Sequence, residues 1–203
     1  DYGFMRKGPE MPESLMRIPF AAWGPGIQAC GAPHKAHVNL VDVIPTICDM
    51  LEITIPDGVQ GKSLKPILYG EPYPKDDFSC AYAEQGIGGL NFDWSDNPDF
   101  EKCSPFPITF DCLNKYSQCG TMKMVRKEDW KLVFDMQGTG WLYNLINDPA
   151  ELNNLYNHPE CAEVQSDLLQ ELLKQTLRAQ DTLPIPGKNY EIKKNLKNYW
   201  SET

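Results

Sequence analysis

The polar pair Glu84 and Gln85 stands directly before a glycine-rich run, residues 86–89, and could contact a substrate. A carboxylate and a side-chain amide exchange hydrogen bonds with hydroxyl groups, and glycines let the following loop bend toward a ligand. The pair therefore suits the binding of a hydroxyl-rich molecule. An ordinary exit from a strand into a loop explains the same residues equally well, so both interpretations stay open.

Basic residues gather further along the chain, in a segment whose alternation is typical of a β-hairpin: Lys123, Arg126, Lys127 and Lys131. They could form a basic rim that faces an anionic substrate, although the solvated face of a hairpin is the more common explanation. The whole chain carries 28 acidic against 19 basic residues, a formal net charge of −9. That balance argues against a nucleic-acid backbone as the main partner.

The spacing of cysteine and histidine argues against a structural zinc site. The chain has 7 cysteines and 3 histidines, no C-x-x-C pair, and no histidine at zinc-finger spacing from a cysteine. His34 and His37 lie in a loop rich in proline and glycine, so we expect them to be structural. Cys103, Cys112 and Cys119 could form disulfides in an extracellular protein, or could stay reduced and packed.

Hydrophobic periodicity and turn residues predict the elements that position these groups. In the first part of the chain we expect a short buried strand at 18–23 and a second short strand at 38–41. A helix is expected to follow, with Asp42 as its N-cap. In the second part we expect four strands and a long amphipathic helix: 79–84, 121–126, 130–136, 141–145 and 159–180. This order predicts an α/β beginning that turns into an α+β fold. No apolar run is long enough to span a membrane.

The chain divides naturally at the polar, proline-bearing stretch 71–77. Residues 86–120 show little periodicity, and a loop of that length is usually functional or cross-linked. The tail 181–203 is polar and is expected to lie along the surface. The expected units are therefore residues 1–76, residues 77–180 with the long loop, and the tail.

Five segments resemble, in the order in which they occur, motifs of the sulfatase family. They are a lysine with Glu-x-x-x-Arg-x-Pro and Gly-Pro-Gly (Lys7, 13–19 and 24–26), Asp-x-x-Pro-Thr (42–46), Gly-x-x-Gly-x-Ser-Leu (58–64), Met-Val-Arg with Trp-Lys-Leu (124–133), and Leu-Tyr-Asn-Leu-x-Asn-Asp-Pro-x-Glu (142–151). Each motif is weak alone, but together they cover roughly residues 1–180. The resemblance is to the C-terminal portion of an arylsulfatase-type enzyme of the alkaline-phosphatase-like superfamily.

The resemblance implies a fold and an activity. Residues 1–76 would be the C-terminal end of the catalytic α/β domain, and residues 77–180 a small α+β subdomain with an antiparallel sheet and one long helix. The intact protein would hydrolyse sulfate esters. The alternatives are a phosphonate monoester hydrolase or phosphodiesterase of the same superfamily, and a non-catalytic glycan-binding or assembly module.

Sulfatases use a formylglycine, made from Cys or Ser in a C/S-x-P-x-R motif, beside a bound Ca²⁺. No such motif occurs in this chain. The resemblance therefore implies that the nucleophile and the Ca²⁺ ligands lie upstream of residue 1, in the remaining N-terminal part of the same protein. The chain alone would then be inactive. An extracellular or periplasmic location is favoured.

The resemblance also assigns roles to individual residues. Lys7 matches the lysine that contacts the sulfate, since a compact ammonium can lie against an anionic oxygen. Tyr2 stands where many members have a histidine that lines the substrate pocket, and a phenol is a poor acid at neutral pH. Glu84 and Gln85 open the loop that would help to select a sulfated small molecule or glycan.

Overall fold

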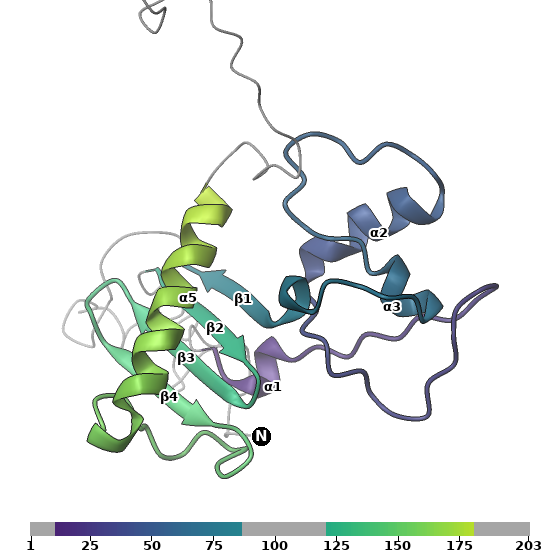
Figure 1. The fold of residues 1–203 in the computed structure, drawn as a ribbon. Coiled ribbons are helices and arrows are strands. Elements are labelled where there is room, and N and C mark those ends of the chain that lie inside the picture. Colours follow the sequence, from purple (N-terminus) through teal and green to yellow (C-terminus); the bar gives the residue numbers. More distant parts are fainter. Residues whose placement is uncertain (1–10, 87–120, 181–203) are drawn as a thin grey trace, which may run out of the picture.

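The computed structural model describes residues 11–86 and 121–180, and its centre is a four-stranded antiparallel sheet (Figure 1). The strands follow one another in the sheet in the order of the sequence: β1 (Cys80–Gln85), β2 (Met122–Lys127), β3 (Trp130–Asp135) and β4 (Gly140–Asn144). Short turns join β2 to β3 and β3 to β4, as expected for sequential antiparallel strands. The predicted meander and the strand before the long loop are confirmed.

One face of the sheet packs against the long helix α5 (Ala162–Gln180), which follows a 3₁₀ turn at Pro159–Cys161. The core here is made of one residue from each of the four strands and two leucines from the helix: Cys80, Val125, Leu132, Leu142, Leu168 and Leu172. The leucines recur at a spacing of four, so they share one face of the helix. Burial of this stripe explains why the predicted helix forms.

The opposite face of the sheet packs against the beginning of the described chain. Strand residues alternate between faces, so Met124 points away from its helix-facing neighbour Val125. Met124 is buried with Met122 and Val133 against Met11, which lies two residues before the one-turn helix α1 (Glu13–Met16). The sheet is therefore the middle of three layers.

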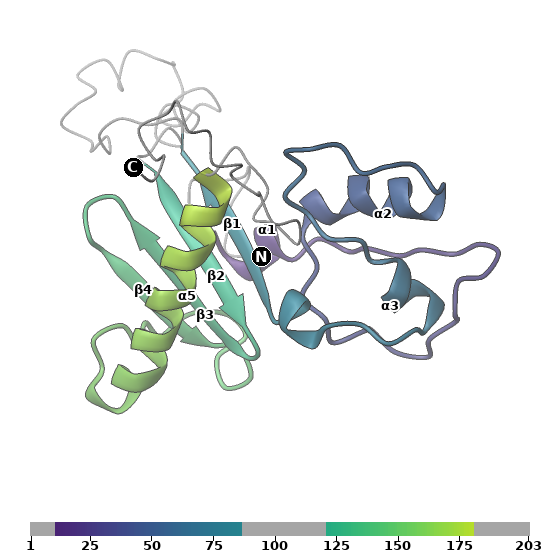
Figure 2. The same cartoon turned by 45° about the horizontal axis from the view of Figure 1, so that its top comes forward.

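The remaining residues of the first part lie beside the sheet (Figures 1 and 2). They contain a 3₁₀ turn at Leu40–Asp42, helix α2 (Val43–Met50), helix α3 (Lys65–Tyr69) and a second 3₁₀ turn at Lys75–Phe78 that leads into β1. The helix predicted after Asp42 is confirmed. No described helix is both long and apolar enough to cross a membrane.

The two strands predicted at 18–23 and 38–41 are wrong. Within the described residues no strand precedes Cys80. The side chain of Trp23 is 92% exposed, so the first segment is not buried either. The physical reason is that a strand needs a partner for its backbone hydrogen bonds, and the described chain offers none beside these segments.

A broad set of apolar side chains is exposed in this part of the molecule. We call it the exposed apolar set: Ile18, Phe20, Trp23, Leu40, Val41, Ile44, Ile47, Leu51 and Ile53. Soluble monomers rarely expose so many large apolar residues within one short stretch, so the set indicates a surface that packs against further protein.

Candidate functional site

Glu84 lies within a small polar group on the helix-facing side of the sheet. It stands directly opposite Lys123 in the pairing of β1 with β2. Lys123 Nζ donates to Glu84 Oε2 over 2.7 Å and to the Tyr82 hydroxyl over 3.1 Å, and that hydroxyl donates to Glu84 Oε2 over 2.8 Å. Tyr82 and Glu84 share a face because they are two residues apart on one strand.

The hydrogen bonds of this group keep both Glu84 and Lys123 ionised. Those from Lys123 and Tyr82 lower the pKa of the Glu84 carboxyl. Burial alone would lower the pKa of Lys123, but its hydrogen bonds with Glu84 and Tyr82 outweigh burial and raise it. A firmly ionised carboxylate is a poor proton donor. The Glu84 side chain is 53% exposed, so what it can offer is a hydrogen-bond acceptor to an external hydroxyl group.

Gln85 points the other way. As the last residue of β1 it pairs with Met122, and its side chain is on the face opposite to Glu84. Because their side chains extend from opposite faces of β1, the two predicted binding residues cannot both contact the same ligand atom. Lys7 and Tyr2 lie outside the described residues, as do loop residues 87–120 and the tail. Their predicted roles stay predictions.

Each basic residue of the hairpin has an acidic partner, which limits any role as a rim for an anionic substrate. Lys123 pairs with Glu84, Lys127 with Asp167 of α5 over 2.7 Å, and Arg126 with Glu13 over 2.7 Å. Lys131 is 0% exposed, so the expectation of a solvated strand face is wrong for this residue.

Lys131 is the centre of a buried ionic cluster that the sequence did not reveal. Its Nζ lies 2.7 Å from Glu151 Oε1, 2.5 Å from the carbonyl oxygen of Met11 and 3.7 Å from Glu13 Oε1. The backbone N–H of Glu13 donates to Glu151 Oε2 over 2.6 Å. Arg126 completes the cluster through its pair with Glu13, so two cations face two carboxylates.

This cluster joins three of the motif segments. Glu13 belongs to Glu-x-x-x-Arg-x-Pro, Arg126 and Lys131 to the hairpin motif, and Glu151 to Asn-Asp-Pro-x-Glu. Glu151 itself has φ 54°, in the left-handed region that costs a non-glycine residue roughly 1 kcal/mol. That conformation is retained where Glu151 contacts Lys131 and the N–H of Glu13. The three motifs therefore meet in space at one set of charges, each of which has a partner of opposite sign that offsets part of the cost of its removal from water.

A second contact region joins the other two motifs. Asp42 is buried, and its carboxylate accepts from the N–H of Asn39 and from the N–H of Lys62, each over 2.8 Å. Asp42 is the N-cap residue of α2, as predicted, but its side chain makes no capping hydrogen bond there; it closes the preceding 3₁₀ turn instead. Asn39 Oδ1 in turn accepts from the N–H of Tyr82 over 2.9 Å, which ties this region to the strand that carries Glu84.

His37 lies close to the same region, where its N–H donates to the carbonyl oxygen of Phe78 over 3.0 Å. Burial, and then the positive charge of Arg126, lower the pKa of His37, while Asp129 opposes them. The unfolded chain therefore binds a proton more readily than the folded one below about pH 6.5.

We expect the free energy of unfolding to decrease as the pH falls through 6.5, until folded His37 also takes up a proton. Urea titrations of the wild type and of His37→Gln between pH 5 and 8 would measure this effect. The difference between the two proteins isolates the histidine from the carboxylates. An identical pH dependence in both would contradict the prediction.

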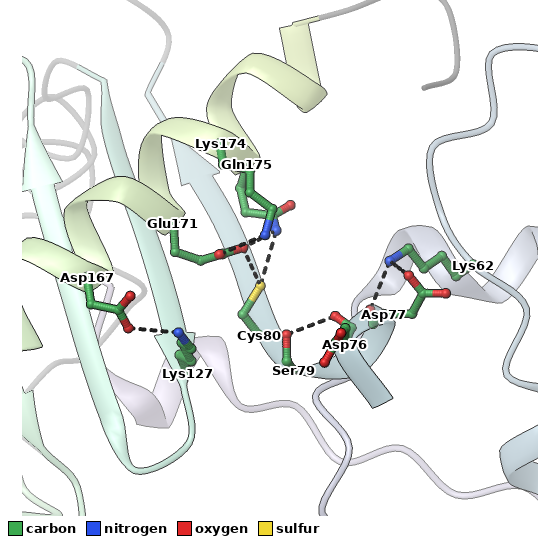
Figure 3. A network of polar contacts seen from close by, with 10 residues as sticks. All are labelled: Lys62, Asp76, Asp77, Ser79, Cys80, Lys127, Asp167, Glu171, Lys174 and Gln175. Atoms are coloured by element: carbon green, nitrogen blue, oxygen red, sulfur yellow. Dashed lines mark hydrogen bonds and ion pairs between the residues drawn. The ribbon is translucent and has the colours of Figure 1, made fainter. Parts of the chain in front are cut away.

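Figure 3 shows a polar network that fastens β1 to α5. The thiol of Cys80 lies 3.3 Å from Glu171 Oε1, and Gln175 Nε2 lies 3.2 Å from the sulfur and 2.7 Å from that carboxylate. Burial, and then the charge of Glu171, raise the pKa of Cys80 to about 11. Almost no thiolate exists at neutral pH, so this cysteine is structural and not a nucleophile.

The described residues do not form a Ca²⁺ site. Within residues 11–86 and 121–180 no three side chains of His, Cys, Asp or Glu are grouped so that they could hold a metal ion. Ca²⁺ needs six to eight oxygen ligands, which the acidic residues described above do not provide, because they are used in pairs with cations or backbone N–H groups.

Comparison with known proteins identifies the relatives of the chain. No protein-family profile matches it. It is 28% identical over 185 residues to an arylsulfatase of Clostridium perfringens, a match that covers 89% of this chain and 31% of the relative. It is 27% identical to an N-acetylglucosamine-6-O-sulfatase of Bacteroides thetaiotaomicron, a match that covers 82% of this chain and 26% of the relative. The chain is related to the C-terminal portion of sulfatases.

Solved structures show the same fold. A 2-O GAG sulfatase matches 78% of this sulfatase-related chain with a TM-score of 0.56 at 22% identity, and the match covers 29% of that structure. A phosphonate monoester hydrolase from Silicibacter pomeroyi matches 69% of the chain with a TM-score of 0.50 at 23% identity, covering 25% of that structure. The chain thus spans less than a third of the lengths of these relatives.

Proposed function

We propose that the protein to which this chain belongs hydrolyses sulfate esters, and that the chain forms the C-terminal part of the enzyme. The observation that carries the proposal is the agreement between sequence and contacts. Sulfatase relatives match 89% of the chain, and each of the five motif segments contributes a residue to the buried cluster or to the contacts around Asp42.

In this proposal the chain alone is inactive. It has no C/S-x-P-x-R motif, and its described residues form no metal site. The formylglycine nucleophile and the Ca²⁺ ligands would belong to the remaining N-terminal part of the protein. That part would also cover the exposed apolar set, whose residues lie in the unit proposed as the end of the catalytic domain, residues 1–76.

The chain's own contribution would be to bind and orient the substrate. Lys7 would lie against a sulfate oxygen, where a fixed positive charge stabilises the negative charge that develops as the ester bond breaks. Tyr2 would line the same pocket as a hydrogen-bond donor. Glu84, with Gln85 and the loop that follows, would contact the organic part of the substrate. The hydroxyl groups of a sulfated glycan suit a carboxylate that stays ionised.

The test is an assay of the full-length protein with an aryl sulfate, an aryl phosphonate monoester and an aryl phosphate diester. We expect the sulfate to be the best substrate. We expect Lys7→Ala to lower kcat/KM for it by about 100-fold, the usual effect of losing one group that stabilises developing charge. Lys35→Ala, a change of an exposed lysine, is the matched control and should leave the activity unchanged.

Two results would contradict the proposal. Preference for a phosphonate or phosphate ester would support the phosphonate monoester hydrolase or phosphodiesterase alternative. Absence of hydrolysis of all three esters, with retained binding to a sulfated glycan, would support a non-catalytic module.

A further inference from the structure

The buried ionic cluster holds the segment Met11–Met16 against the sheet through backbone atoms as well as side chains. Lys131 Nζ contacts the carbonyl oxygen of Met11, and Glu151 accepts from the N–H of Glu13. The Glu13 carboxylate lies between Arg126 and Lys131. Since β2 and β3 supply both cations, the cluster defines where the segment lies relative to the sheet.

The segment could not hold this position by itself. Helix α1 has four residues, and its N-cap residue Pro12 offers no side-chain hydrogen bond. A single helical turn is unstable in isolation, because forming it costs more conformational entropy than its few hydrogen bonds return. Its location therefore depends on the sheet, through the ionic cluster and through Met11 in the apolar layer with Met124.

The position of this segment bears on Lys7, which precedes Met11 by four residues in the sequence. Four residues span at most about 14 Å when fully extended, so a fixed Met11 restricts where Lys7 can be. We propose that the cluster of Glu13, Arg126, Lys131 and Glu151 is a positioning device: by holding Met11 on the sheet, it limits the positions that Lys7 can reach. This inference rests on the proposed function, which gives Lys7 its contact with sulfate.

Hydrogen–deuterium exchange tests whether the cluster fixes the segment. In the full-length protein, Glu13→Gln should raise the exchange rates of the amides of Leu15, Met16 and Arg17 about tenfold or more, with little change in β3. Glu171→Gln is the matched control, because Glu171 is 12% exposed against 15% for Glu13 and is also ion-paired, but lies on α5 across the sheet. Unchanged exchange in Glu13→Gln would overturn the inference.

A double-mutant cycle tests whether the cluster acts through Lys7. Glu13→Gln should lower kcat/KM for an aryl sulfate about tenfold, mainly through kcat, since small misplacements of a contacting group cost rate. In a Lys7→Ala background it should cause no further loss. Losses that multiply would show independent effects and overturn the inference. If the wild type hydrolyses no sulfate ester, the proposed function fails and the role of Lys7 with it, while the exchange data still decide whether the cluster anchors the segment.

Discussion

Replacing Lys131 with methionine should lower the free energy of unfolding by about 3–5 kcal/mol, the usual cost of removing one partner from a buried ion pair. The side chain is fully buried, and its ammonium contacts Glu151, Glu13 and the carbonyl oxygen of Met11. Methionine fills a similar volume, so little packing is lost. The loss arises because the carboxylate of Glu151, whose side chain is 5% exposed, and the carbonyl oxygen of Met11 then lack their cation, whereas Glu13 keeps its pair with Arg126.

The matched control for this prediction is Lys127→Met, on the same hairpin. Lys127 also pairs with a carboxylate over 2.7 Å, but its partner Asp167 is more than half exposed. Exposed ion pairs contribute about 0–1 kcal/mol, so this variant should differ little from the wild type. Urea unfolding followed by circular dichroism measures both. Equal effects of the two changes would show that the burial of Lys131 does not determine its contribution.

A methyl group added at Gly61 should lower the free energy of unfolding by about 3 kcal/mol or more, because overpacking against backbone cannot be relieved by a change of rotamer. The Cβ of Gly61→Ala would lie 2.0 Å from the carbonyl oxygen of Val41 and 2.9 Å from the backbone nitrogen of Asp42. To make room for this Cβ, the segment around Gly61 must move away from Val41 and Asp42. That movement would also break the hydrogen bond from the N–H of Lys62 to Asp42.

Gly31→Ala is the control for that change. A Cβ at Gly31 would meet nothing within 4 Å, so its effect should stay within about 0.5 kcal/mol, as for ordinary surface substitutions. The melting temperatures of the two variants, measured by calorimetry, give the comparison. If the Gly61→Ala protein had the same melting temperature as the wild type, the loops around Val41 and Lys62 could move apart freely, contrary to this prediction.

The sheet and its helix were predictable because their signals are local. Alternation of apolar residues marks β2 and β3, and the leucine spacing of Leu168 and Leu172 marks the buried face of α5. The strands expected at 18–23 and 38–41 had equally apolar residues. They failed because apolar residues show only that a segment prefers burial, whereas a strand exists only where another strand can pair with it.

For the candidate site too, the residue types suggested roles, but the fold decided where each side chain lies. The types of Glu84 and Gln85 suggested binding, but the pleat of β1 sends them to opposite faces. The basic residues of the hairpin were visible, but not that Lys131 is buried while Lys127 stays exposed. Glu13 donates its N–H to a carboxylate 138 residues further along the chain, and no local pattern carries information over that separation.

The resemblance to sulfatases, the order of the motifs and the periodicity of the sheet and α5 could all be recognised in the amino-acid sequence. That three of the motifs meet around Lys131, that two meet at Asp42, and that the exposed apolar set is left uncovered became evident from the folded chain. Residue types and spacing act within a few turns or one strand, whereas the pairing of buried charges depends on which distant segments the fold brings together.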